Sequence, residues 1–250
     1  MNKNGRSLRE FKSLPFPDIS LINMCRNTLI MDELRYDRES LKNEHLSLYS
    51  GLNIEQKVVY TAILEAVYSD YGRFFFVYGS GGTGKTYLWR TVIARLRSEG
   101  KIVLAVASSG IAALLLPGGR TAHSRFKLRE SSCCDINQGT QLAELICKSS
   151  LIIWDEAPMA HRNAFEALDG SLRDILRFHA PNSTNKSFGG KTVALGGDFR
   201  QILPVVPQGG REDIVATSIS DSTLWHQCKV YKLTINMRLR DPTMDSNAIQ

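Results

Sequence analysis

Residues 79–86 constrain this chain more than any other segment, because they read Gly-Ser-Gly-Gly-Thr-Gly-Lys-Thr. They follow an apolar run at residues 74–78 and open a helical pattern at residues 86–98. A strand, a glycine-rich loop with this spacing and a helix are typical of a site for nucleotide phosphates. Glycines let backbone N–H groups turn toward phosphate oxygens, and the N-terminus of the helix adds partial positive charge. The segment therefore predicts a nucleoside triphosphate site.

The side chains of this loop have separate expected roles. Lys85 is expected to reach the β- and γ-phosphates as a point charge, and the Thr86 hydroxyl is expected to ligate Mg²⁺. ATP and Mg²⁺ are therefore the predicted cofactors, and an ordinary glycine-rich turn is the alternative. The loop residues predicted to hold the nucleotide are Gly79, Ser80, Gly81, Gly82, Thr83, Gly84, Lys85 and Thr86.

Apolar, β-branched or aromatic runs recur along the chain and alternate with helical patterns. Such strands, apolar on both faces, predict an α/β fold with a mainly parallel sheet and helices on both faces. The expected strands are residues 74–78, 102–107, 151–154 and 192–195, with a weaker one at 230–233. The clearest expected helices are residues 86–98 and 165–178, preceded by a helix that Asn53 caps and that ends near residues 71–72.

The first fifty residues differ from the rest. Pro15 and Pro17 interrupt regular structure, and residues 32–48 form a charged helical pattern without a strong apolar stripe. We therefore expect a mostly helical N-terminal appendage at residues 1–50 and one catalytic domain at residues 51–250. No apolar run approaches the roughly 18 residues that a membrane span requires, so no membrane partner is expected.

Two adjacent acids, Asp155 and Glu156, follow the predicted strand at residues 151–154. Ligands of open α/β sheets bind at the carboxyl ends of the strands. Asp155 is therefore expected to hold the Mg²⁺ shell and Glu156 to act as the general base toward water, with an ordinary surface pair as the alternative. The Asn-Lys-x-Asp motif of GTPases is not matched at Asn185-Lys186, so the pattern favours ATP hydrolysis that drives motion.

The net charge of +6 comes almost entirely from residues 51–150, which carry 12 basic and 7 acidic side chains. Within ten positions, four of these basic residues surround Phe126. Cations beside an aromatic ring suit a single strand of nucleic acid, because the charges neutralise phosphates and the ring stacks on bases. A solvated basic loop is the alternative. The four basic residues are Arg120, Arg125, Lys127 and Arg129.

Further motifs lie in register with the phosphate loop and the acidic pair, at residues 52–56, 107–113, 118–126, 196–205 and 233–238. Together they resemble the superfamily-one DNA helicases of the petite-integration-frequency (PIF) family and its relatives carried by Helitron transposons. The resemblance covers residues 52–238. It implies a RecA-like P-loop NTPase core and an ATP-dependent DNA helicase that translocates 5′→3′ on single-stranded DNA. It also implies a role in DNA repair, recombination or telomere maintenance, in the nucleus or in mitochondria.

The same resemblance assigns roles to individual residues. Gln56 is expected to read adenine, Gln201 to contact the γ-phosphate, and Arg238 to serve as the arginine finger. Single-stranded DNA or a duplex junction is the expected partner. Phe126 and His123 are ambiguous, because either side chain could belong to the core instead. The residues that the resemblance places against DNA are Ser109, Gly110, Thr121, His123, Arg125 and Phe126.

One departure from the family pattern concerns the second motor domain. Family helicases have two RecA-like domains, whereas this sequence ends twelve residues after Arg238. We therefore expect only the first motor domain here, with a second RecA-like domain or chain as a further partner. The alternative is a truncated, transposon-derived remnant that binds ATP and DNA without unwinding.

Overall fold

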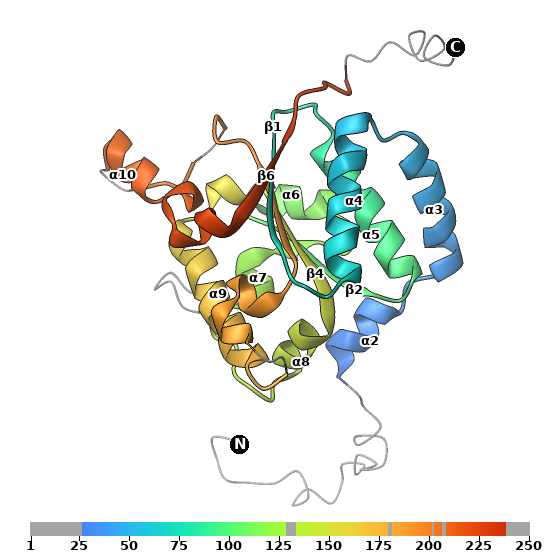
Figure 1. The fold of residues 1–250 in the computed structure, drawn as a ribbon, viewed down its shortest axis with the longest axis horizontal. Helices are drawn as coiled ribbons and strands as arrows, with labels where there is room; N and C mark the ends of the chain where they lie inside the picture. The colour runs from blue at the N-terminus through green and yellow to red at the C-terminus, as the bar shows by residue number, and fades with distance from the viewer. Residues whose placement is uncertain (1–26, 129–133, 180–181, 202, 207–208, 239–250) are drawn as a thin grey trace, which may run out of the picture.

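A computed structural model describes residues 27–128, 134–179, 182–201, 203–206 and 209–238. Its centre is a six-stranded, all-parallel sheet with strand order β3-β2-β4-β5-β1-β6 (Figure 1). The strands are β1 (Phe74–Gly79), β2 (Ile102–Ala107), β3 (Arg120–Thr121), β4 (Ser149–Asp155), β5 (Val193–Gly197) and β6 (Cys228–Leu233). The α/β prediction is confirmed, and all five expected strands are present. The two-residue β3 was not predicted, because so short a segment carries no periodicity.

Helices cover both faces of the sheet. The α-helices are α2 (Thr28–Leu34), α3 (Arg38–Ser50), α4 (Ile54–Tyr68), α5 (Lys85–Ser98), α6 (Gly110–Leu115), α7 (Ala122–Phe126), α8 (Gln141–Lys148), α9 (Arg162–Leu176) and α10 (Arg211–Ala216). Short 3-10 turns lie at Ala157–Met159, Ser183–Asn185, Ser187–Gly190, Ile219–Asp221 and Thr223–Gln227. None of the helices in these described ranges has the length and apolarity needed to cross a membrane.

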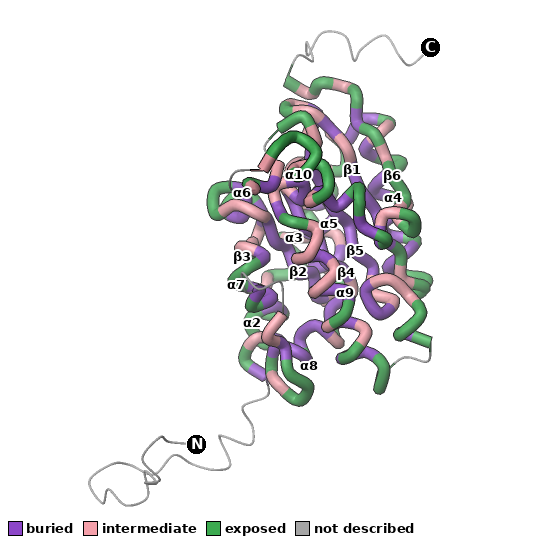
Figure 2. The backbone as a smooth tube through the Cα atoms, turned by 90° about the vertical axis from the view of Figure 1, so that its left-hand side faces the viewer, coloured by how far each residue is buried: buried purple, intermediate pink, exposed green. Residues whose placement is uncertain are grey.

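The alternation of side chains along each strand divides the core into two layers. On β1, Phe74 and Phe76 pack in the layer beneath α8 and α9, whereas Phe75 and Val77 pack in the layer beneath α4 and α5. Successive side chains of a strand point to opposite faces, so a run that is apolar throughout supplies both layers. Figure 2 shows the inner strands of the sheet as the buried centre of the molecule, whereas the edge strands β3 and β6 are partly exposed.

The N-terminal helices pack on this domain. Ile30 of α2 belongs to the core layer beneath α8 and α9, and Tyr87 of α5 donates a hydrogen bond to the Leu48 carbonyl of α3 at 2.8 Å. Glu33 of α2 pairs with Arg97 of α5, at 3.2 Å, and with Arg125 of α7. The boundary at residue 50 stays a prediction, but residues 27–50 form part of the packed structure. The rest of the predicted appendage, residues 1–26, lies outside the described residues.

Candidate active site

The phosphate loop lies between β1 and α5, as its sequence context predicts. Two of its glycines have positive φ, Gly82 at 90° and Gly84 at 78°. These backbone conformations are strained for residues with a Cβ. A Cβ on Gly82 would also lie 2.8 Å from the Asn236 side-chain oxygen, and one on Gly84 would lie 2.5 Å from the Gln56 side chain. The glycines therefore permit both the turn and the close approach of two distant segments.

Thr83 closes the loop on itself. Its hydroxyl donates to the Ser80 carbonyl at 2.8 Å, and its side chain is buried. Lys85 begins α5, and its ammonium donates to the carbonyls of Gly79 and Ser80. Burial lowers the pKa of Lys85, and nearby carboxylates, Asp155 first, act in the opposite direction. The lysine thus lies in a partly desolvated position, where its charge interacts strongly with other charged groups.

The carboxyl end of β4 brings the acidic pair to the same place. Asp155 is buried, and its Oδ1 accepts the Glu156 backbone N–H at 3.0 Å. Burial raises the pKa of Asp155, while that hydrogen bond and the charge of Lys85 act in the opposite direction. Glu156 has a left-handed backbone, with φ of 51°, and its Oε2 accepts the Ser109 hydroxyl at 2.6 Å.

The end of β5 contributes two glycines and a third acid. A Cβ on Gly196 would lie 2.9 Å from the Asp155 Oδ1, and one on Gly197 would lie 2.2 Å from the Pro158 ring. These glycines therefore let the β4 turn approach β5. Asp198 follows directly. Burial alone would raise the pKa of Asp198, but hydrogen bonds from the Arg200 backbone and side chain hold it below its usual value.

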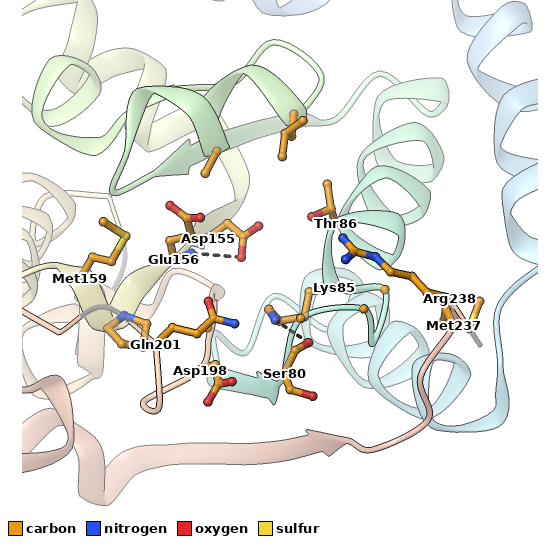
Figure 3. A pocket seen from close by; sticks show the side chains of 17 residues that line it. Ser80, Lys85, Thr86, Asp155, Glu156, Met159, Asp198, Gln201, Met237 and Arg238 are labelled. Carbon is orange, nitrogen blue, oxygen red and sulfur yellow. Dashed lines mark hydrogen bonds between the residues drawn. The ribbon is translucent and has the colours of Figure 1, made fainter. Parts of the chain in front are cut away.

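All four predicted catalytic residues and both predicted magnesium ligands line one cavity of about 420 Å³. In Figure 3, the acidic pair and Arg238 lie on either side of Lys85. Met237 ties the C-terminal segment to the loop, since its N–H donates to the Gly82 carbonyl at 2.8 Å. The lining residues predicted from the sequence are Ser80, Gly81, Gly82, Gly84, Lys85, Thr86, Asp155, Glu156, Gln201 and Arg238.

Seven lining residues had no predicted role: Ala112, Leu115, Pro158, Met159, Gly197, Asp198 and Met237. Asp198 could have been assigned from its place directly after a strand at the same sheet edge as Asp155. Met159 and Met237 carry no comparable sequence signal, because only the fold brings them to the cavity.

Gln56 lies apart from the cavity wall, under the loop. Its Oε1 accepts the Asn53 N–H at 3.0 Å, which completes a capping box at the start of α4. Its amide nitrogen donates to the carbonyls of Thr83, at 3.1 Å, and Gly84, at 3.3 Å. The side chain is fully buried, and its hydrogen bonds to the two carbonyls stabilise the loop in this conformation. Its reading of adenine stays a prediction.

The segment predicted to contact DNA follows β2 and β3, beside the cavity. Gly110 and His123 are exposed there, and Thr121 caps α7. Two predicted contacts need correction. Phe126 is fully buried, with its ring centroid 6.1 Å from that of Trp154, and Arg125 is buried against Glu33. The core alternative holds for Phe126.

The cause of both errors is the direction of the side chains. A five-residue helix turns one side toward the core, and the sequence of α7 alone does not say which side. Arg120 and Lys127 of the same segment are exposed, and Arg129 lies outside the described residues.

Comparison with known proteins identifies the family of this chain. The profile described as "PIF1-like helicase" matches residues 51–250. This chain belongs to the PIF1-like helicase family. Among curated relatives, the ATP-dependent DNA helicase PIF4 of Trypanosoma brucei is 33% identical over 162 residues, which cover 61% of this chain and 18% of that protein. The ATP-dependent DNA helicase PIF1 of Danio rerio is 33% identical over 189 residues, which cover 72% of this chain and 26% of that protein.

Solved PIF1-like structures share the fold. The Pif1 helicase from Bacteroides in complex with ADP-AlF3 and single-stranded DNA aligns with a TM-score of 0.60 and 25% identity, over 76% of this chain and 44% of that one. The predicted family and RecA-like core are therefore confirmed. The chain spans about a fifth to a quarter of the length of the two curated relatives.

Proposed function

We propose that this chain binds Mg-ATP in the 420 Å³ cavity and hydrolyses it as a motor domain that moves on single-stranded DNA. The observation that carries this proposal is the meeting of Lys85, the acidic pair and Arg238 around one cavity. These groups come from three separate parts of the chain, and each suits a part of phosphoryl transfer. The solved relative that holds ADP-AlF3 and single-stranded DNA supports the same assignment.

The residues present fit the nucleotide and its metal. The loop between β1 and α5 has the positive-φ glycines that phosphate binding requires, and Lys85 starts the helix directly behind it. Thr86 and the buried Asp155 would hold Mg²⁺, which supplies charge neutralisation at the β- and γ-phosphates. Glu156 would orient a water molecule and accept its proton, and Arg238 would stabilise negative charge on the transferred group.

Finer assignments rest on the family resemblance alone. They are the 5′→3′ polarity, the roles in repair, recombination or telomere maintenance, and the nuclear or mitochondrial location. They stay predictions, as does action at a duplex junction.

Replacing Lys85 tests the nucleotide site. We expect Lys85→Ala to weaken Mg-ATP binding by at least tenfold, because the loss of one charge-assisted contact costs roughly 1.5–3 kcal/mol. Isothermal titration calorimetry measures this change directly. Lys42→Ala, at an exposed lysine of α3, is the matched control and should bind as the parent does. Equal affinities of the parent and the Lys85→Ala variant would refute the proposed site.

A further inference from the structure

A second set of cations lies at the amino ends of the strands, opposite the nucleotide cavity. Arg73, Lys101 and Lys148 directly precede β1, β2 and β4, and Lys191 lies two residues before β5. These residues line two hollows of about 370 and 490 Å³, and Lys186 lines both. We call this region the amino-edge surface, defined by Arg73, Lys101, Lys148, Lys186, Lys191 and Lys229.

The charge of the amino-edge surface is strongly unbalanced. Among the residues that line the two hollows, Asp70 is the one carboxylate against six cations. In the part of the chain that the structure describes, none of the six forms an ion pair. This excess of positive charge attracts a polyanion, although Asp70 acts on Lys191 and the Glu99 carboxylate accepts the hydroxyl of Tyr68 beside Lys101.

Two exposed tyrosines accompany these cations. The ring of Tyr68 lies under Lys101, with 5.5 Å from Nζ to the centroid, and Tyr71 lies under Lys186 at 4.9 Å. Tyr68 is 47% exposed and Tyr71 is 63% exposed. Aromatic faces beside phosphate-binding cations suit unpaired bases, because every base has a flat face that can stack on an aromatic ring. An acidic peptide would use the charges but would not stack on the rings.

We propose that the amino-edge surface binds a second segment of single-stranded DNA, separate from the segment predicted beside the nucleotide cavity. Lys191 forms the floor of the surface, since its ammonium donates to the carbonyls of Cys147 and Ser149 at 2.6 Å each. Lys148 and Lys229 are exposed, and neither donates a side-chain hydrogen bond among the described residues, although the Lys229 ammonium lies 5.1 Å from the centroid of the Tyr231 ring. They are therefore the positions at which the charge can be removed without disturbing the fold.

The test compares two double variants of the full chain by fluorescence anisotropy with a labelled oligothymidylate, titrated with salt. For Lys148→Gln with Lys229→Gln, the slope of log affinity against log salt should become shallower by about 1.4, because each phosphate contact on a single strand contributes about 0.7. The control, Lys42→Gln with Lys57→Gln, removes two exposed lysines of α3 and α4 that line neither hollow. Its slope should equal that of the parent.

Three outcomes would overturn the proposal. The first is an unchanged slope in the Lys148 and Lys229 variant. The second is an unchanged DNA slope together with weakened binding of polyglutamate, which would assign the surface to an acidic protein. The third is a parent chain with no measurable affinity for the oligothymidylate. None of these outcomes bears on ATP binding, which the Lys85→Ala titration tests separately.

A different observation links the DNA-facing segment to the acidic pair. The Ser109 hydroxyl accepts the Ala112 N–H at 3.2 Å, so it caps α6, and it donates to the Glu156 carboxylate at 2.6 Å. One hydroxyl therefore joins the start of α6 to the predicted general base. Any shift of α6 that moves its first turn must change the position of the Glu156 carboxylate or break this bond.

Helix α6 is placed to respond to a bound strand. Ile111 is 80% exposed and Leu114 is 85% exposed, while Ala112 and Leu115 line the nucleotide cavity. Of its six residues, only Ala112 and Ala113 are buried, so few apolar side chains fix the helix in place. Resting on the proposed function, we infer that Ser109 is a positioning residue that couples DNA binding at α6 to hydrolysis at Glu156.

Steady-state ATPase assays of the full chain, with and without oligothymidylate, test this coupling. In Ser109→Ala, the ratio of kcat with DNA to kcat without DNA should fall at least about fivefold, because the hydrogen bond to a charged group is lost. The affinity for Mg-ATP should stay within about twofold of that of the parent. Ser109→Thr keeps the hydroxyl and should retain the ratio. Thr140→Ala removes the cap of α8, far from the cavity lining, and should also retain it.

An unchanged ratio in Ser109→Ala would overturn the coupling, as would a parent whose hydrolysis does not respond to DNA. In both cases the parent still hydrolyses ATP, so the proposed hydrolysis stands, but the second outcome would also remove the assignment of the domain as a motor on DNA. A parent without any hydrolysis would refute the proposed function, and this inference with it.

Discussion

At the scale of single residues, two adjacent acids at the end of β4 lie in different environments. Asp155 is buried and bonded to the next backbone N–H, whereas Glu156 turns away through a left-handed backbone and meets Ser109. Such a conformation is uncommon for a residue with a Cβ and often occurs at functional sites. The division predicted between a metal ligand and a base therefore has a structural basis in the turn itself.

Glu156→Gln tests the role of the base. The amide keeps the size of the side chain but cannot accept a proton, so we expect ATP affinity to persist while turnover falls by about 10²- to 10⁴-fold. Calorimetry measures the affinity and a phosphate-release assay measures the turnover. Glu65→Gln, at an exposed position of α4, serves as the control. Parental turnover in Glu156→Gln would remove this residue as the base.

At the scale of elements, the short helix α2 holds two other helices together. Its Glu33 lies between Arg97 of α5 and Arg125 of α7, with all three side chains buried. The ring of Tyr36, just after α2, lies 4.1 Å from the Arg97 guanidinium carbon. Two buried cations share one carboxylate, so this contact joins the N-terminal helices to the DNA-facing segment.

Glu33→Gln should destabilise the domain. Removal of the carboxylate leaves two buried guanidinium groups without a counter-charge, which typically costs about 3–5 kcal/mol. Urea unfolding followed by circular dichroism measures the free energy of unfolding. The control is Glu39→Gln, at an exposed position in the first turn of α3. A change below about 0.5 kcal/mol, the range of ordinary surface substitutions, would show that the Glu33 contact does not stabilise the domain.

Helices α3 and α4 meet through a buried histidine. His45 forms a hydrogen bond of 2.7 Å with the Tyr60 hydroxyl. Burial and the nearby Arg95 lower the pKa of His45 below its ordinary value of 6.5, although Glu99 acts in the opposite direction. The unfolded chain therefore binds a proton more readily than the folded one as the pH falls below 6.5, so stability decreases in that range.

The pH dependence of unfolding measures this effect. Between about pH 7 and pH 5, the free energy of unfolding of the parent should fall more steeply than that of His45→Phe, which cannot titrate. Urea denaturation at several pH values gives both curves. Parallel curves for the two proteins would assign the acid sensitivity to other groups.

At the scale of the whole molecule, the described strands form one sheet, and the nucleotide cavity lies at the carboxyl ends of these strands. Directional movement on DNA requires two bodies that alternate their grip, and the family pattern supplies them as two RecA-like domains. One domain suffices to hold the phosphate loop, the acidic pair and Arg238.

We therefore expect residues 1–250 alone to hydrolyse ATP faster when single-stranded DNA is present, without separating a duplex. An ATPase assay and a strand-separation assay on the same preparation check both halves of this expectation. Strand separation by this chain alone would show that one domain is sufficient, whereas no response to DNA would remove the motor assignment.

The amino-acid sequence by itself determined the strand positions, the phosphate loop, the acidic pair and the family. These features are local. The periodicity within one strand and the spacing within one motif can be recognised without knowing any distant contact. The run at residues 102–107, for example, corresponds to β2 at both of its ends.

Only the tertiary structure decided which of those residues are accessible and which distant groups they meet. Phe126 and Arg125 lie in a motif that resembles a DNA contact, yet the packing of α7 against Trp154 and Glu33 buries both. Ser109 was expected at DNA, but the adjacency of β2 and β4 brings its hydroxyl to Glu156, 47 residues away. Burial and such long-range pairs depend on the relative placement of elements, which no local pattern encodes.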